Sequence, residues 1–132
     1  MQFTLFHVAM SRGPGQSVSE AQMAAMLHGD VSEAIAERLY SAVAIVEADD
    51  WVDLFRRTNS IDAPWTAVNP VLAGPMGLRS TSVGDIAMAG TDMRAVSPGG
   101  WTSVDSRCRD RLLRDTQDAL ESLQNSLAGL GN

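Results

Sequence analysis

The chain has 132 residues, 45% of them hydrophobic, which is the composition expected of one globular domain over residues 1–132. All ten basic residues are arginines and the net charge is −6, so we expect no direct binding to nucleic acid, whose phosphates need a basic surface. The absence of lysine excludes a P-loop, and no apolar run approaches the ~18 residues of a membrane span.

A single cysteine, Cys108, excludes an internal disulfide. The first residues lack the basic segment and the apolar core of a signal peptide, so we expect a cytoplasmic protein. The two histidines, His7 and His28, and this cysteine lack the spacing of metal ligands, so we expect neither a metal nor another cofactor. A protein this acidic could instead be attracted to a basic partner surface.

Residues 2–10 are predicted to form a strand with apolar side chains on both faces, which favours a central place in a sheet. Ser17 with Glu20 is a capping-box pattern, and it predicts a helix over residues 18–28 that ends at Gly29. The apolar stripe expected to face the core consists of Met23, Met26 and Leu27.

A second capping pattern, Asp30 with Glu33, predicts a helix over residues 31–39. Residues 40–47 could prolong that helix, but their aromatic and β-branched side chains favour a buried strand, which is our prediction.

Asp49 or Asp50 is expected to cap a helix over residues 50–57, on which an apolar face combines Trp51, Val52 and Phe55. Thr58 to Gly77 is predicted to be an irregular loop because it carries several prolines and glycines. A loop of roughly twenty residues is long for a compact domain and is typical of a functional segment.

A β-hairpin is predicted next, with strands over residues 82–88 and 93–97. A hydroxyl-rich run leads through Gly-Asp into the first strand, Gly-Thr-Asp separates the strands, and Pro-Gly-Gly closes the second one. Strands and helices follow one another without a regular βαβ order. The order therefore predicts an α+β fold with a small mixed or antiparallel sheet and helices on one side.

One long helix is predicted over residues 104–128, because apolar residues recur along one side and charged residues along the other. This helix is expected to cover a face of the sheet or a partner helix, and a homodimer through it is a further hypothesis. Its apolar stripe consists of Cys108, Leu112, Ala119, Leu120, Leu123, Leu127 and Leu130.

No catalytic motif occurs in the sequence. Nothing in it places Ser80 or Ser82 near His7 or His28, so we expect no enzyme. An acidic cluster could bind a divalent cation, but capping of the following helix is the interpretation that we favour. The cluster consists of Glu47, Asp49, Asp50 and Asp53.

A polar and aromatic set around the long loop and the hairpin forms the candidate binding surface, because loops carry function and Trp and Arg supply binding energy. The alternative is that the polar side chains hydrogen-bond the loop backbone and the tryptophans lie in the core. The set consists of Asn59, Asp62, Trp65, Asn69, Arg79, Ser80, Ser82, Asp85 and Trp101.

Several short motifs occur together between residues 40 and 101. They are Asp50-Trp-Val-Asp-Leu-Phe55, Thr58-Asn-Ser-Ile-Asp62, Trp65, Asn69, Arg79-Ser-Thr-Ser-Val-Gly-Asp85 and Gly100-Trp101. This segment resembles the YodL-like group of small accessory proteins of plasmids, integrative elements and phages, which carry a Ser-x-Ser-Val-(Gly/Ser)-Asp run, a hairpin and a Gly-aromatic pair. Two departures are Met93, where the group usually has a tyrosine, and the inserted helices between Gln16 and Arg38. The resemblance implies a mobile-element setting and no catalytic activity.

We therefore expect a non-enzymatic binding protein of a phage or other mobile element that acts through protein–protein contact. Its partner would be a host protein, for example a nucleic-acid-binding one, and its role would be inhibition of a host defence such as CRISPR or restriction. The alternative is a small-molecule-binding module in which Trp65 or Trp101 lines a pocket.

Overall fold

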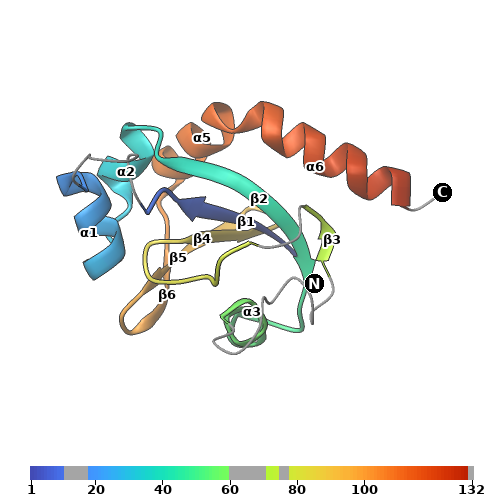
Figure 1. Ribbon diagram of the computed structural model, residues 1–132, viewed down its shortest axis with the longest axis horizontal. Coiled ribbons are helices and arrows are strands. Elements are labelled where there is room, and N and C mark those ends of the chain that lie inside the picture. The colour runs from blue at the N-terminus through green and yellow to red at the C-terminus, as the bar shows by residue number, and fades with distance from the viewer. Residues whose placement is uncertain (11–17, 60–70, 75–77, 131–132) are drawn as a thin grey trace.

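The computed structural model describes residues 1–10, 18–59, 71–74 and 78–130, and these form an antiparallel sheet with helices on both faces (Figure 1). The strands are β1 (Gln2–Val8), β2 (Tyr40–Glu47), β3 (Val71–Ala73), β4 (Ile86–Ala89), β5 (Asp92–Ser97) and β6 (Gly100–Ser103). They lie in the order β3-β2-β1-β4-β5-β6, and every neighbouring pair is antiparallel. The α+β class is confirmed. The sheet was expected to be mixed or antiparallel, and it is antiparallel.

The helices lie on two sides of this sheet, so the expectation of helices on one side was wrong. One face is covered by α3, and the other by the remaining described helices (Figure 1). The helices are α1 (Glu20–His28), α2 (Ser32–Ala36), α3 (Trp51–Thr58), α5 (Ser106–Asp115) and α6 (Gln117–Leu130).

Strand β1 lies in the middle of the sheet, between β2 and β4, as its two apolar faces predict. Phe3 and Leu5 are fully buried against Leu54 of α3. Phe6 and Val8 are buried on the opposite face, in the core that α1, α2 and α5 cover. Burial of apolar side chains on both faces makes this strand the centre of the fold.

Helix α1 begins two residues later than the capping pattern predicts. Ser19 is the N-cap: its Oγ accepts a hydrogen bond from the Gln22 N–H at 3.2 Å, and the Gln22 side chain accepts one from the Ser19 N–H at 2.9 Å. Ser17 lies outside the described residues. The predicted end at Gly29 is confirmed, with the glycine in the left-handed conformation at φ 72°.

We expect Ser19→Ala to lower the free energy of unfolding by about 1 kcal/mol, because it removes one half of this reciprocal cap. Ser19→Asp keeps a side-chain acceptor and should retain most of the stability. Urea denaturation of the two variants and the wild type measures the difference. Equal stability of the alanine variant and the wild type would contradict the assignment of the cap.

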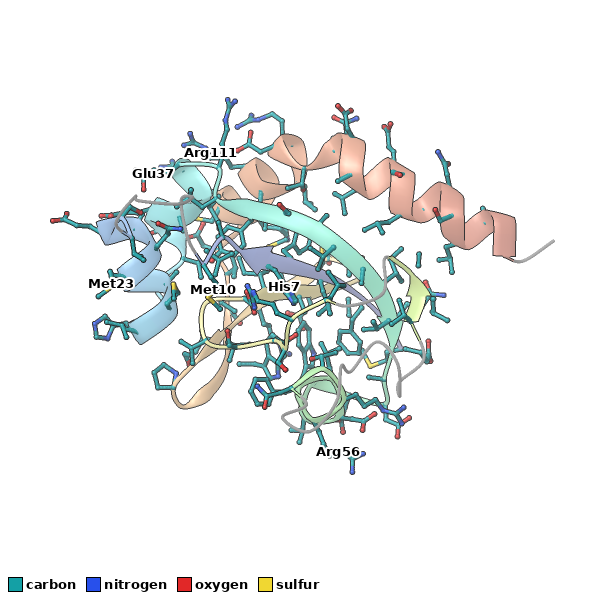
Figure 2. The ribbon with its side chains drawn as sticks, viewed as in Figure 1. His7, Met10, Met23, Glu37, Arg56 and Arg111 are labelled. Atoms are coloured by element: carbon teal, nitrogen blue, oxygen red, sulfur yellow. The ribbon has the colours of Figure 1, made fainter. Side chains whose placement is uncertain are left out.

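The apolar stripe predicted for α1 is confirmed only for Met26, which is partly buried and packs against the core. Met23 and Leu27 are exposed, and Figure 2 shows Met23 pointing away from the sheet. The helix instead buries its alanine face, with Ala21 and Ala25 at 2% and 0% exposure. The reason is a close approach of backbones: a Cβ on Gly84 would lie 2.7 Å from the Ala25 carbonyl oxygen. Small side chains on the helix allow this approach, and methionine or leucine there would not.

Helix α2 is shorter than the predicted 31–39 segment, and its N-cap is Val31, without a side-chain hydrogen bond. Asp30 and Glu33 do not form the expected capping box, because the Asp30 carboxylate accepts from the hydroxyl and the N–H of Ser32. The strand chosen over residues 40–47 is confirmed as β2. The cap of α3 is confirmed too: the Asp50 carboxylate accepts from the Asp53 N–H at 2.7 Å.

Two short strands are absent from the prediction. β3 lies within the segment predicted to be irregular, and β6 begins at the last glycine of the Pro-Gly-Gly that was expected to close the hairpin. The hairpin itself is confirmed as β4 and β5, although β4 begins at Ile86 because residues 82–85 form a turn.

The predicted C-terminal helix is divided at Thr116 into α5 and α6. The Thr116 hydroxyl donates to the Leu112 carbonyl at 2.7 Å, and this bond accompanies the break in the helix. Leu112 packs against the core beneath α5, and Leu123 packs against Ile45 and Ala73 beneath α6. The apolar stripe therefore contributes to the core of its own chain, and the homodimer through this helix stays a prediction.

Candidate functional site

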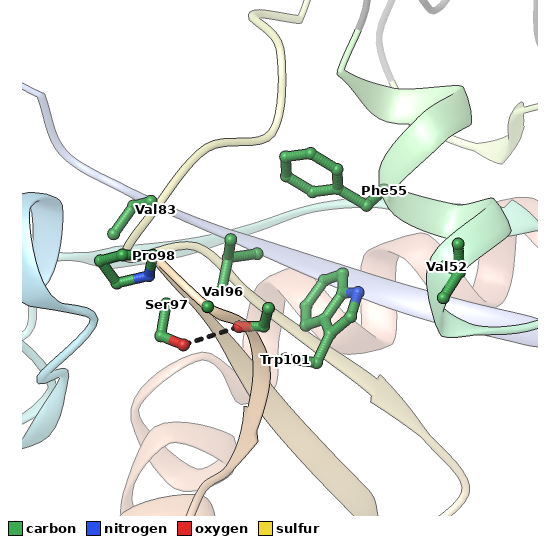
Figure 3. A pocket seen from close by; sticks show the side chains of 9 residues that line it. Val52, Phe55, Val83, Val96, Ser97, Pro98 and Trp101 are labelled. Carbon is green, nitrogen blue, oxygen red and sulfur yellow. Dashed lines mark hydrogen bonds between the residues drawn. The ribbon is translucent and has the colours of Figure 1, made fainter.

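An apolar groove of about 420 Å³ separates α3 from the tip of the β5–β6 hairpin (Figure 3). One wall comes from α3 and the other from the hairpin and the turn before β4. The lining residues are Val52, Phe55, Val83, Val96, Ser97, Pro98, Gly99, Gly100 and Trp101. None of these side chains titrates, so the groove offers an apolar surface and no acid or base.

An aromatic cluster forms the floor at the α3 end of the groove. The Trp51 ring makes edge-to-face contacts with Phe3 and Trp101, with centroids 5.0 and 5.1 Å apart. The Trp101 Nε1–H donates to the Trp51 carbonyl at 2.8 Å, and the Arg94 guanidinium lies 4.6 Å from the Trp51 ring centroid. Edge-to-face packing and the hydrogen bond hold Trp101 in place, so this part of the groove is preformed.

Val52 is an exposed large hydrophobic residue of the lining. Its side chain is 77% exposed on the outer side of α3, where Figure 3 shows it beyond Trp101 at the edge of the groove. Phe55, one turn further along the helix, is partly buried and makes an edge-to-face contact with Trp101 at 6.5 Å. An exposed valine beside half-buried aromatic rings gives α3 an apolar surface that a ligand can cover.

Behind the groove lies a buried polar network centred on Asp85, which has 0% exposure. Its carboxylate accepts two hydrogen bonds from the Arg79 guanidinium, at 2.6 and 2.7 Å. It also accepts from the backbone N–H groups of Val8 at 2.9 Å and Ser82 at 2.8 Å. Arg79 donates in addition to the Val8 carbonyl. A bidentate pair with two backbone donors satisfies this buried charge and ties the turn before β4 to the end of β1.

The same turn is bonded to both walls of the groove. On the hairpin side, the Gly84 N–H donates to the Val96 carbonyl and the Val96 N–H donates to the Asp85 carbonyl. On the α3 side, the Thr81 N–H donates to the Thr58 carbonyl at 2.8 Å. We call residues 79–85 the brace, because their hydrogen bonds connect the hairpin, β1 and the end of α3.

His7 and Tyr40 border the brace from β1 and β2. The Tyr40 hydroxyl donates to the Gly84 carbonyl at 2.6 Å, and burial raises the pKa of Tyr40. Burial also lowers the pKa of His7 from 6.5 to about 4, an effect that the nearby Asp85 carboxylate opposes only in part and Arg79 reinforces. Both side chains are therefore neutral near pH 7.

A histidine, a hydroxyl and a carboxylate do converge here, although the sequence does not predict it. His7 Nε2 lies 3.3 Å from Thr81 Oγ1 and 4.0 Å from Asp85 Oδ2. The three residues are only 6%, 1% and 0% exposed, so a substrate cannot reach them in this conformation (Figure 2 labels His7). The Asp85 carboxylate is moreover occupied by the four hydrogen bonds of the network. The arrangement stabilises the fold and offers no open catalytic cleft.

We expect the stability that neutral His7 contributes to decrease as the pH falls from about 6.5 towards 4. In this window the unfolded chain takes up a proton on the histidine and the folded chain does not, so protons favour unfolding. The measurement is the difference in unfolding free energy between the wild type and His7→Gln, followed from pH 7 to pH 4. As the pH falls, the wild type should lose unfolding free energy relative to His7→Gln. A difference that does not change with pH would contradict a buried, neutral His7.

The nine residues predicted as a candidate surface divide into three groups. Trp101 lines the groove, and Asp62, Trp65 and Asn69 lie outside the described residues. The other five make internal contacts in or beside the brace: the Asn59 side chain, for example, donates to the Thr81 carbonyl at 2.6 Å. These five are Asn59, Arg79, Ser80, Ser82 and Asp85. A direct binding role for any of the nine stays a prediction.

The sequence-based prediction missed the groove residues Val83, Val96 and Pro98, and named Val52 and Phe55 only as helix residues. The apolar face of α3, which combines Trp51, Val52 and Phe55, is the signal that could have identified the two helix residues as part of a site. The hairpin residues carry no such local signal, because they meet α3 only through the tertiary fold.

In the acidic cluster, Asp50 and Asp53 form hydrogen bonds and ion pairs with other residues of α3. The backbone N–H of Asp49 and the guanidinium of Arg56 hold the pKa of Asp53 well below its usual range, and Arg57 donates to the same carboxylate at 2.7 Å. Over the described ranges, no three His, Cys, Asp or Glu side chains are grouped as metal ligands would be. Capping and ion pairing therefore account for Asp50 and Asp53.

Comparisons with protein-family models, curated proteins and solved structures find no match. Among the helices of the described residues, none combines the length and the apolar character that a membrane span requires.

Proposed function

We propose that the chain is a non-enzymatic binding protein that acts through protein–protein contact, and that the groove between α3 and the β5–β6 hairpin is its contact site. The observation that carries this proposal is the exposure of Val52 next to the packed rings of Phe55 and Trp101. Interfaces obtain most of their binding energy from a few aromatic anchors in preformed apolar sites surrounded by polar residues.

Preorganisation supports this function. Trp101 is held by its hydrogen bond to Trp51 and by two ring contacts, so binding would order few side chains. Each side chain that must be immobilised on binding costs about 0.5–1.5 kcal/mol, and a rigid groove avoids much of that cost. The brace contributes by fixing the backbone that carries Val83 and Val96.

The charge of the chain favours a basic partner. A net charge of −6 on 132 residues attracts cationic surfaces and repels nucleic acid, although it does not supply most of the affinity. A host nucleic-acid-binding protein has such a surface. Together with the resemblance to the YodL-like group, this supports a mobile-element protein that acts in the cytoplasm and inhibits a CRISPR or restriction component.

Affinity capture with matched variants tests the proposal. Val52→Asp places a charge at the edge of the groove on a side chain that is already exposed, so it should fold normally. Leu27→Asp is the control, because Leu27 is a similarly exposed apolar residue on α1. The wild type and the control should retain the same protein from lysates of bacteria that carry defence systems, and Val52→Asp should lose it. Capture of nothing, or equal capture by all three, would overturn the proposal.

A second candidate function is small-molecule binding. It is favoured by the volume of the groove, about 420 Å³, which lies within the range of ligand pockets. Trp101 lines the groove, so an apolar ligand should change tryptophan fluorescence. An unchanged spectrum across a panel of nucleotides and metabolites would count against this function and leave the protein-binding proposal intact.

A further inference from the structure

Strand β6 is an open edge of the sheet. It pairs with β5 on one side and is the last strand in the order, so no described strand pairs with its other side. Its residues are exposed except for Trp101, which is partly buried. An open edge presents unpaired N–H and C=O groups, and these are a template for another extended chain.

The hydrogen bonds of the β5–β6 pair identify which groups point outward. The Val104 N–H donates to the Met93 carbonyl, which makes these two residues a hydrogen-bonded pair of the antiparallel ladder. Bonded and non-bonded pairs alternate, so Thr102 and Gly100 bond to β5 and Trp101 and Ser103 do not. The N–H and C=O groups of Trp101 and Ser103 therefore face the open edge.

The groove is continuous with this edge. Trp101 contributes its side chain to the groove and its backbone to the edge, and Val52 lies beyond its ring at the outer side (Figure 3). Directly opposed residues on neighbouring strands place their side chains on the same face of the sheet. A residue of an added strand opposite Trp101 would therefore direct its side chain towards Val52 and Phe55.

Two exposed carboxylates lie near this position. Asp49 and Asp50 are exposed just before α3, two and three residues from Val52. Arg94 lies over the Trp51 ring and is already paired with Asp92. An added strand with basic side chains on the groove face would complement the two exposed carboxylates.

We propose that the partner binds by strand addition: an extended segment pairs antiparallel with β6, places an apolar side chain opposite Trp101 in the groove, and carries basic residues on the same face. This inference rests on the proposed function and specifies how the partner is recognised. The main-chain bonds to Trp101 and Ser103 would supply affinity, and the groove would supply the preference for an apolar residue.

The test uses capped peptides with the sequence Lys-Thr-X-Thr-Lys and the uniformly ¹⁵N-labelled protein. With X as leucine, we expect saturable shifts of the Trp101 and Ser103 amides and slower hydrogen exchange at both. The peptide with X as aspartate should bind at least about tenfold more weakly. N-methylation of the leucine amide should cause a similar loss, because it removes the donor to the Trp101 carbonyl.

Variants of the protein separate the two proposals. Ser103→Pro removes an outward N–H and leaves the bonds of Thr102 and Val104 to β5 in place, so it should fold and lose the peptide. Val52→Asp should lose it too, and Leu27→Asp should bind normally. If a captured partner is lost with Val52→Asp and kept with Ser103→Pro, the groove is the contact site and strand addition is wrong. If neither variant affects capture, both proposals fail.

Three other results would overturn strand addition. The first is the absence of shifts with the leucine peptide at millimolar concentration. The second is slow exchange of the Trp101 and Ser103 amides in the dilute free protein, which would mean that the edge is already covered. The third is protection of these amides that rises with protein concentration together with dimer formation in sedimentation, which would make a second copy of the chain the occupant.

Discussion

Asp85→Ala is expected to lower the free energy of unfolding by about 3 kcal/mol, because it leaves two buried N–H groups and a partly exposed arginine without their acceptor. The substitution removes the acceptor of four hydrogen bonds at a site with 0% exposure. The N–H groups of Val8 and Ser82 would remain buried without this acceptor, and Arg79 would lose its bidentate contact. Urea denaturation followed by circular dichroism measures the effect.

Asp92→Ala is the matched control. Asp92 also pairs with an arginine, Arg94, at 2.8 Å, but both side chains of this pair are partly exposed. Exposed pairs contribute between about 0 and 1 kcal/mol, so this variant should remain close to the wild type. If Asp85→Ala lowers the free energy of unfolding no more than Asp92→Ala does, the brace does not contribute to the stability of the fold.

Gly84→Ala is expected to destabilise the protein by about 2–5 kcal/mol, for two reasons that add. Gly84 has φ +94°, a conformation that L side chains rarely adopt. The new Cβ would also lie 2.7 Å from the carbonyl oxygen of Ala25, which belongs to the backbone of α1 and cannot rotate away. The substitution should therefore separate α1 from the brace.

Gly90→Ala isolates the backbone contribution. Gly90 lies in the β4–β5 turn with φ +60°, and nothing lies within 4 Å of the position of its Cβ. Only the left-handed conformation is then penalised, by about 1–2 kcal/mol. Thermal denaturation of both variants should show the larger loss at Gly84, and the reverse order would contradict the close packing of α1 on the brace.

Local sequence patterns predicted the elements whose signals are complete within a few residues. The alternation in β1, the β-branched run of β2, the Asp50 cap and the β4–β5 hairpin are of this kind, and all four are confirmed. β3 and β6 were missed because each has only three or four residues and depends on a neighbouring strand for its conformation.

The errors have one tertiary cause and one local cause. Apolar periodicity on α1 favoured Met23 and Leu27 as part of the buried side, but the backbone of Gly84 lies against the backbone of Ala25, and the helix buries its small side chains there. The single helix predicted after β6 is divided at Thr116, whose hydroxyl bonds the preceding turn.

The groove was not predictable as a site. Its residues come from α3, from the turn before β4 and from the β5–β6 hairpin, and only the fold brings them together. The Ser-Val-Gly-Asp run was identified from the sequence, but its polar residues point inward. Asp85 bonds Arg79 and the backbone, and Val83 is the member of the run that reaches the groove.

The most direct test of the account is photo-crosslinking from the groove. A benzophenone-bearing residue in place of Val52, with the same residue in place of Leu27 as control, reports which surface a partner covers in a bacterial lysate. We expect a light-dependent adduct with one defined protein from position 52 and none from position 27, with the site of attachment mapped by mass spectrometry. Adducts of equal yield from both positions, or from position 27 alone, would contradict the assignment of the groove as the contact site.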